Sequence, residues 1–495
     1  MRSVEQLCWR WNEFPAFKRP KALRHRRMNA PPLFGVPATT TPAPEAAGPR
    51  WESWAEFLIL GVFAVVGLNH VHSNTPFGQD FLLHSNATEA LLADPSKWFP
   101  QNFTNRPLIY WIGAFGHWLT HGKAPYEMAA VIFVLMNTLA LHVAHATTRG
   151  FIASPWLRLA GISFIAFLPS TQVSVVVYAA DAVSLFPFVL TIWGLWRSLE
   201  ARSVRASAGY AAVAGLALCL GNFAKFSYVV LPVAVVLALI LTCRAQRISG
   251  RRGLMIGALA LIAPVLTGGW IHLQARRQLA NVPPQHKFDW HGTGEMTWCD
   301  LLLVKASDRR IFDAPSYWDT ELVKGVNEYA LPLRHNYSYP ALLHLAIYTD
   351  VLDYANQGQY DDGAPRPEPQ KTLSRWAVRL GLLTTAAVFL ALLAFLARSG
   401  LALVNRQRAP ATGVLLWGLM ALAWYLPLVL TFPYLHAAYE SGYWLPRLVI
   451  PALWGFGLVA FAAADGLLAR HRHWRALLAG LVFLQAAVHI RSVWF

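Results

Sequence analysis

The sequence predicts an all-α membrane protein that crosses the bilayer many times. Of its 495 residues, 55% are hydrophobic and only 14% are charged. A soluble chain of this length needs far more charge to cover its surface. Several apolar runs approach or reach the length of about 20 residues that spans a bilayer core. Backbone polar groups inside hydrocarbon must be bonded internally, so each run is predicted to be a helix.

Eleven apolar runs are interpreted as spanning helices. We place them at residues 54–71, 126–147, 156–173, 182–199, 207–222, 226–243, 253–273, 377–397, 413–431, 444–466 and 475–490. The segment 106–122 is also apolar, but it is short, rich in Trp and Tyr, and carries His117 and His121. These features favour a juxtamembrane helix that lies in the membrane interface rather than a further span.

The arrangement of basic residues supports this count. If 106–122 does not span, the short loops rich in arginine, such as 244–252, fall on one side of the membrane. The other side then receives 72–125 and 274–376, where the charges are mixed or acidic. The positive-inside rule therefore predicts a cytoplasmic N-terminus and places the C-terminus on the opposite side.

The chain divides into four predicted regions. Residues 1–50 are basic and rich in Pro and Ala, which is typical of a disordered cytosolic tail. Residues 51–273 form a first group of spans that includes the first outside loop, and residues 377–495 hold the remaining spans. The segment 274–376 between them is too long for a passive connector, so we expect it to pack as an extramembrane cap.

Charge and cysteine content argue against two other classes of function. The net charge is +16, but the basic residues lie at the ends of apolar runs, where membrane topology requires them, so nucleic-acid binding is not predicted. The four cysteines show no paired spacing, so neither a disulfide framework nor a zinc site is predicted. They are Cys8, Cys219, Cys243 and Cys299.

The first outside loop contains an acid and a histidine close to the membrane surface. In "FGQDFLLH", Asp80 and His84 are four residues apart, so a helix would place both on one face. Asp80 has two interpretations. It is either a solvated loop acid or an acid directed into a cavity at the interface.

Four more charged residues lie in or beside apolar runs on the same side. Asp181 could cap a helix, and Lys225 could extend its amine to the interface. Arg447 is harder to explain structurally, because a charge inside a span is costly and is usually partnered. Glu440, seven residues earlier, is a candidate partner.

One reaction accounts for these residues together. A lipid-linked sugar phosphate would lie with its tail in the bilayer and its phosphate at this face. Lys225 and Arg447 could hold that phosphate, with Asp181 and Glu440 at the edge of the site. An acceptor hydroxyl must lose a proton, so a single carboxylate base is sufficient, and Asp80 is the candidate, with His84 beside it.

The order of the motifs resembles that of the GT-C membrane glycosyltransferases. The resemblance is carried by "QDFLLH", "NRPLIYWIGAFGHWL", "YAADAV", "GNFAKFSYVVLP" and "PRLVIP", over roughly residues 54–275 and 410–460. It is strongest to the bacterial relatives of protein O-mannosyltransferases and of the lipid A aminoarabinose transferase. The chain departs from the family pattern in three motifs: Gln79 precedes Asp80 where many relatives have an acidic pair, "RPLIYW" replaces a "PPLYY" core, and Ala180 precedes Asp181 where Asn or Pro is usual. The segment 274–376 carries no motif of the family.

This resemblance implies a sugar donor linked to polyprenyl phosphate and an acceptor that is a lipid, a glycan or a protein. It also implies a bacterial inner membrane with the active face in the periplasm. Related members differ in their need for a divalent metal. Because the sequence shows no convincing metal-ligand set, we assign no metal and no other cofactor.

Three alternatives remain open at the level of sequence. A transporter or flippase also places charges within the membrane, although the spans show no internal repeat of the kind many transporters have. The departures from the family pattern also allow an inactive relative. A purely structural membrane subunit is a weaker alternative, since it would not need Arg447 inside a span.

Overall fold

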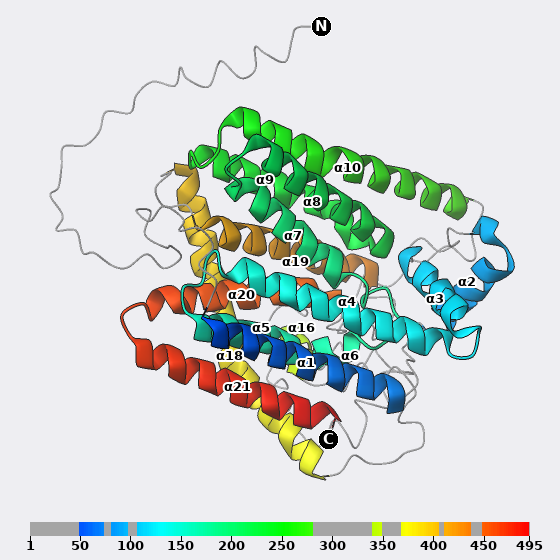
Figure 1. Ribbon diagram of the computed structural model, residues 1–495, viewed down its shortest axis with the longest axis horizontal. Helices are drawn as coiled ribbons and strands as arrows, with labels where there is room; N and C mark the ends of the chain where they lie inside the picture. Colours follow the sequence, from blue (N-terminus) through cyan, green and yellow to red (C-terminus); the bar gives the residue numbers. More distant parts are fainter. Residues whose placement is uncertain are drawn as a thin grey trace, which may run out of the picture. The chain divides into compact units, whose positions relative to one another are not determined.

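The computed structural model describes residues 49–73, 81–97, 106–280, 339–348, 368–404, 410–436 and 448–494, and every regular element among them is a helix (Figure 1). Asp80, Glu440 and Arg447 lie outside these residues, as do the N-terminal tail and most of the expected cap. The helices are α1 (Arg50–Ser73), α2 (Phe81–Ala93), η3 (Pro95–Lys97), α3 (Leu108–Thr120), α4 (Pro125–Thr148), α5 (Pro155–Phe167), α6 (Pro169–Ser174), α7 (Leu185–Glu200), α8 (Val204–Ala224), η4 (Phe226–Val230), α9 (Leu231–Arg244), α10 (Gly250–Ala280), α16 (Tyr339–Tyr348), α18 (Glu368–Val404), α19 (Thr412–His436), α20 (Ile450–Leu467) and α21 (Arg472–Trp494).

Helices occupy each of the eleven expected spans, and this confirms the class of multi-pass helical membrane protein. Over the described residues, eight of them have the length and hydropathy of a membrane span: α1, α4, α8, η4 with α9, α10, α18, α20 and α21. The other three, α5, α7 and α19, do not meet that criterion over their described residues. The total of eleven spans therefore remains a prediction.

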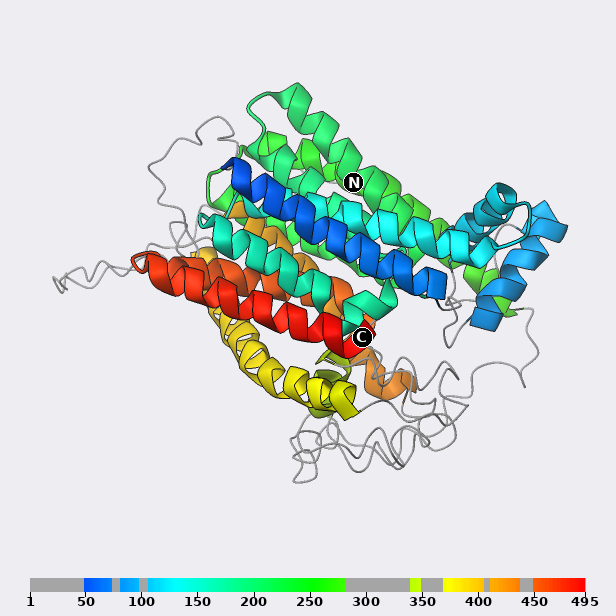
Figure 2. The same ribbon diagram turned by 60° about the horizontal axis from the view of Figure 1, so that its bottom comes forward.

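Spans that are close in sequence pack against one another. Helix α8 contacts both α7 and α10, and α1 contacts α4 and α5 (Figures 1 and 2). The C-terminal helices return to the N-terminal group, since α19 contacts α9 and α7, while α21 packs between α5 and α18. Helices from both halves of the chain therefore form one core.

The centre of this core is aromatic. Trp417 and Trp424 of α19 are fully buried, and the Phe188 ring of α7 meets both edge-on at centroid distances of 6.2 and 5.5 Å. Helix α20 approaches α19 closely at Gly455, where a Cβ atom would lie 2.6 Å from the Ala421 Cβ. Small residues at such contacts allow helices to pack tightly within a membrane.

Exposed tryptophans near the helix ends indicate where the membrane interfaces lie. Tryptophan favours the interface because its ring is apolar and its N–H is polar. One group lies at the starts of α1, α5 and α21, and a second lies on α3 and late in α10. The residues are Trp51, Trp54, Trp156 and Trp474 in the first group, and Trp118 and Trp270 in the second.

Helix α3 is the short apolar helix expected near residues 106–122. Its 13 residues extend about 20 Å, which is too short for the roughly 30 Å hydrocarbon core. One face, including Ile109 and Tyr110, is buried against the protein. Phe115 and Trp118 on the other face are exposed, with their rings stacked at a centroid distance of 5.7 Å. This arrangement suits a helix that lies in the interface.

Candidate functional site

Two clusters of charged and polar side chains lie at opposite ends of α4. We call the first the Lys225 end; it is formed by α2, α3, the loop between α6 and α7, and the junction of α8 with η4. Helices α2 and α3 lie together beside the start of α4, on the right of Figure 1. We call the second the Glu52 end; it is formed by the start of α1, the last turns of α4 and the start of α5.

The Lys225 end contains a buried ion pair between two residues that the sequence singled out. Lys225 follows the last residue of α8, and its Nζ contacts the Asp181 carboxylate from the loop before α7. The two side chains are only 12% and 8% exposed. The Nζ atom also lies 5.9 Å from the centre of the Trp424 ring. Asp181 thus fixes the position of a lysine that is largely shielded from water.

Arg106 lies against the residue that follows Lys225, and the sequence analysis did not identify it. The residue is 1% exposed, and its Nε and Nη1 atoms have no hydrogen-bond partner in the part of the chain that the structure describes. Its guanidinium lies 5.4 Å from the centre of the ring of Phe226, the residue after Lys225. Burial lowers the pKa of Arg106 to about 10, so the group is still protonated near neutral pH.

An arginine in this state is suited to an anionic ligand. Taking a charge out of water costs several kcal/mol, and buried charges are normally paired. The planar fork of N–H donors matches the oxygens of a phosphate or carboxylate. Together with Lys225, Arg106 brings a second positive charge to the Lys225 end. The feature of the sequence that could have identified Arg106 is its position directly before Pro107, at the start of the interfacial helix α3.

His84 lies inside the protein on the same end. Helix α2 begins at Phe81, directly after Asp80, and it directs His84 inward to 1% exposure. The His84 Nδ1 atom is 3.2 Å from the Tyr110 hydroxyl of α3. Helix α2 is also held by Tyr126 of α4, whose hydroxyl donates to Glu89 Oε1 at 2.9 Å and to the Ser85 carbonyl at 3.3 Å.

Of the six residues that the sequence predicted for the site, three are described, and two of these are in contact. Asp181 and Lys225 pair directly. His84 lies next to Tyr178, which precedes Asp181 by three residues. The ring centroids of His84 and Tyr178 are 6.2 Å apart. The positions of Asp80, Arg447 and Glu440 are outside the described residues, so convergence of the whole set remains a prediction.

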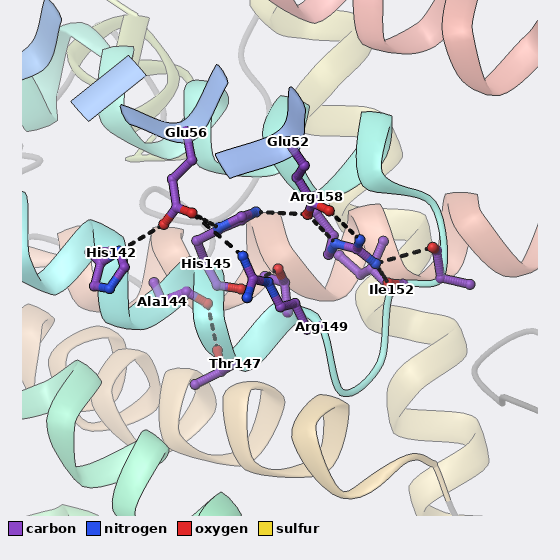
Figure 3. Close-up of polar contacts among 11 residues, drawn as sticks. Glu52, Glu56, His142, Ala144, His145, Thr147, Arg149, Ile152 and Arg158 are labelled. Atoms are coloured by element: carbon purple, nitrogen blue, oxygen red, sulfur yellow. Dashed lines mark hydrogen bonds and ion pairs between the residues drawn. The ribbon is translucent and has the colours of Figure 1, made fainter. Parts of the chain in front are cut away.

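The Glu52 end contains a second network, which the sequence analysis also missed (Figure 3). His145 of α4 lies between two carboxylates of α1. Its Nε2 atom is 3.2 Å from Glu52 Oε1, and its Nδ1 atom is 2.8 Å from Glu56 Oε2. Both ring nitrogens are within ion-pair distance of these oxygens without meeting the geometry of a hydrogen bond. His142 reaches the other oxygen of Glu56 at 2.8 Å.

Arg158 of α5 completes this network. Its Nε and Nη2 atoms each donate to one oxygen of Glu52 at 2.7 Å, and its Nη1 atom donates to the carbonyls of Ile152 and Ala153 (Figure 3). The network therefore ties α1, α4 and α5 together. The acidic side chains of the network are paired with its histidines and arginine. Among the described residues, no group of three or more His, Cys, Asp or Glu side chains has the geometry of a metal site.

Comparison with known proteins identifies the fold. The chain is similar to the oligosaccharyltransferase of Archaeoglobus fulgidus in its apo form, with a TM-score of 0.50 and 10% identity over 90% of this chain. The chain spans 56% of the length of that enzyme. The predicted resemblance to GT-C membrane glycosyltransferases is thereby confirmed as a likeness of fold.

A further similarity is to ArnT of Cupriavidus metallidurans, in the apo state and bound to undecaprenyl phosphate. The TM-scores are 0.37 and 0.38, with 14% and 15% identity over 85% and 84% of this chain and 78% of ArnT in both cases. No family model matches the sequence, and no curated protein matches it.

Proposed function

We propose that the protein is a membrane glycosyltransferase that moves a sugar from a polyprenyl-phosphate-linked donor to a hydroxyl acceptor. The observation that carries this proposal is the buried Arg106 guanidinium. Two of its nitrogens have no hydrogen-bond partner among the described residues, and it lies against the ring of Phe226, the residue after Lys225. The GT-C fold, shared with an oligosaccharyltransferase, supports the reaction class.

The location of the two cations favours a lipid-linked phosphate. Arg106 precedes the interfacial helix α3, and Lys225 lies where the spanning helix α8 ends. A phosphate attached to a polyprenyl chain reaches this depth with its tail still in the bilayer. Arg106 would bind two phosphate oxygens as a fork, while Lys225, held by Asp181, would supply a point charge. Arg447, as predicted from the sequence, would add a third cation.

In the proposed sugar transfer, Asp80 and the two cations have different roles. The acceptor hydroxyl attacks the anomeric carbon of the sugar and forms the new glycosidic bond. The bond between that carbon and the phosphate oxygen breaks, and the lipid phosphate leaves with the electron pair. Asp80 takes the hydroxyl proton as general base. Arg106 and Lys225 stabilise the charge that develops on the leaving phosphate.

The side of the membrane on which this reaction would take place follows from the distribution of charges in the sequence. The distribution of arginines predicts that the Lys225 end faces the periplasm of a bacterial cell, with the N-terminus in the cytoplasm. The acceptor would then be a lipid, a glycan or a protein on that side of the inner membrane.

Binding of undecaprenyl phosphate to the protein in nanodiscs tests the proposal. Wild-type protein should bind it, and Arg106→Gln should weaken binding at least about tenfold, since hydrogen bonds to charged groups contribute about 1.5–3 kcal/mol. Arg251→Gln is a matched control, because Arg251 is exposed and lies far along α10 from this site. Equal affinity in wild type and Arg106→Gln, or no binding by wild type, would contradict the proposed site.

A further inference from the structure

Tyr178 is a buried tyrosine whose hydroxyl links two separate elements. It lies between α6 and α7 and is fully buried. Its hydroxyl donates to the Ile109 carbonyl of α3 at 3.1 Å and lies 2.8 Å from Thr88 Oγ1 of α2. A buried tyrosine hydroxyl normally has one hydrogen-bond partner. The Tyr178 hydroxyl has two among the described residues, and they join α2, which follows Asp80, to α3, which follows Arg106.

The surrounding packing leaves the Tyr178 hydroxyl little freedom to move. Its ring is stacked on Phe133 at a centroid distance of 6.0 Å and meets Tyr126 at 4.9 Å and Phe81 at 6.2 Å. A Cβ atom on Gly113 of α3 would lie only 2.0 Å from the hydroxyl oxygen. The absence of a side chain at Gly113 therefore makes room for this contact.

The loop that carries Tyr178 also carries Asp181, and it is fixed from two further sides. Asn137 of α4 donates from Nδ2 to the Ala182 carbonyl at 2.8 Å. The Ser184 hydroxyl donates to the Asp181 carbonyl at 2.7 Å, and the Tyr228 hydroxyl of η4 donates to the Ser184 carbonyl. Hydrogen bonds within and around the loop thus hold the backbone beside Asp181, while the Asp181 carboxylate holds Lys225.

We infer that Tyr178 is a positioning residue, which couples α2 to the Asp181–Lys225 pair. Through Thr88 and Phe81 it fixes the helix that begins directly after Asp80, and through the loop it fixes the lysine assigned to the phosphate. This inference rests on the proposed function. A base and a phosphate site must act on the same carbon, and a misplacement of about 1 Å can lower the rate about 100-fold.

Two substitutions isolate the hydroxyl contact while keeping the packing. Tyr178→Phe removes the hydroxyl, and Thr88→Val removes its partner on α2 with little change of shape. Each should lower kcat for sugar transfer about tenfold or more and leave the KM for the donor within about twofold. The donor KM should hold because the loop beside Asp181 keeps its hydrogen bonds from Asn137 and Tyr228 in both variants, so Lys225 stays in place while α2 is released. The loss in the double variant should be smaller than the product of the two single losses, because both substitutions remove the same Tyr178–Thr88 contact. Each single variant also loses one bond of its own, from Tyr178 to the Ile109 carbonyl or from Thr88 to the His84 carbonyl.

Hydrogen exchange provides a readout that does not depend on activity. In either single variant the amides of α2 should exchange faster than in wild type, while those of α20 should be unchanged. Tyr210→Phe is the control, because Tyr210 lies near the start of α8, towards the other end of the bundle, and its hydroxyl accepts a long hydrogen bond from Arg197, at 3.4 Å.

The outcomes separate this inference from the proposed function. Faster exchange in α2 together with a non-additive loss of kcat supports the coupling. Wild-type exchange in α2, additive effects of the two substitutions, or a loss of kcat with an equal rise in KM overturns it. If the wild-type protein transfers no sugar, the proposed function fails. The exchange of α2 then decides the coupling alone, and Thr88→Val replaces Tyr178→Phe if the latter does not fold.

Discussion

Arg158 and Glu52 form a two-bond ion pair that joins α5 to α1, with both N–O distances at 2.7 Å. Glu52 is fully buried, and Arg158 is nearly so. Loss of one member leaves the other charge buried, a change that costs about 3–5 kcal/mol. We therefore expect Glu52→Leu to lower the free energy of unfolding in mixed detergent micelles by about that amount.

A second substitution makes this prediction specific. Replacing both residues, as in Glu52→Leu with Arg158→Met, removes both charges and should restore much of the lost stability, because an apolar pair of similar volume packs without a desolvation penalty. His145 would still contact Glu56. If the double variant is less stable than Glu52→Leu alone, the pair is not the source of the effect.

Removing the counter-ion of Lys225 should have an effect that ligand can reverse. Asp181→Asn leaves Lys225 without the carboxylate that it contacts, so we expect lower thermal stability without ligand. Undecaprenyl phosphate should then raise the melting temperature of the variant more than that of wild type, because the bound anion replaces the lost charge. An equal shift in both proteins would separate Lys225 from the phosphate site. Lys225→Met tests directly whether Lys225 binds the phosphate. In this variant, undecaprenyl phosphate should no longer raise the melting temperature.

Gly113→Ala should disturb the contact between α3 and Tyr178. The added Cβ would lie 2.0 Å from the Tyr178 hydroxyl oxygen, and overpacking of this kind costs about 1–3 kcal/mol. Adding Tyr178→Phe should reduce the loss, since the phenylalanine ring ends one atom earlier. Gly61→Ala is the control, because nothing lies within 4 Å of its added Cβ. Unfolding in mixed micelles measures all three, and equal stability of the Gly113 and Gly61 variants would rule out the clash.

The positions of the spans could be predicted because hydrocarbon leaves the backbone few alternatives to a helix. The details at their ends could not be predicted in the same way. The expected span 156–173 is interrupted at Leu168, and α6 begins anew at Pro169, because proline cannot continue the hydrogen bonding of α5. The span expected from 226 begins as the 3-10 helix η4 and becomes α9 only at Leu231.

In the candidate site, too, the residue types could be predicted from the sequence but their contacts could not. Asp181 and Lys225 stand out in the sequence because charges are rare in apolar segments, but their pairing depends on how the loop before α7 meets the end of α8, 44 residues away. Arg106 is not recognisable from composition, since its burial depends on how elements distant in the sequence pack around it. The Glu52 network was missed because Glu52 precedes the expected first span and His145 lies in a run that is otherwise apolar.

Sugar transfer by Asp80→Asn in nanodiscs, from a polyprenyl-phosphate sugar donor, tests the central claim most directly. The substitution keeps the shape of the side chain and removes the proton acceptor, and a general base contributes about 10²–10⁴-fold in rate. The wild-type protein should transfer sugar, and the Asp80→Asn variant should be at least about 100-fold slower while still binding undecaprenyl phosphate with wild-type affinity. Transfer by the variant at the wild-type rate, or no transfer by either protein, would contradict it.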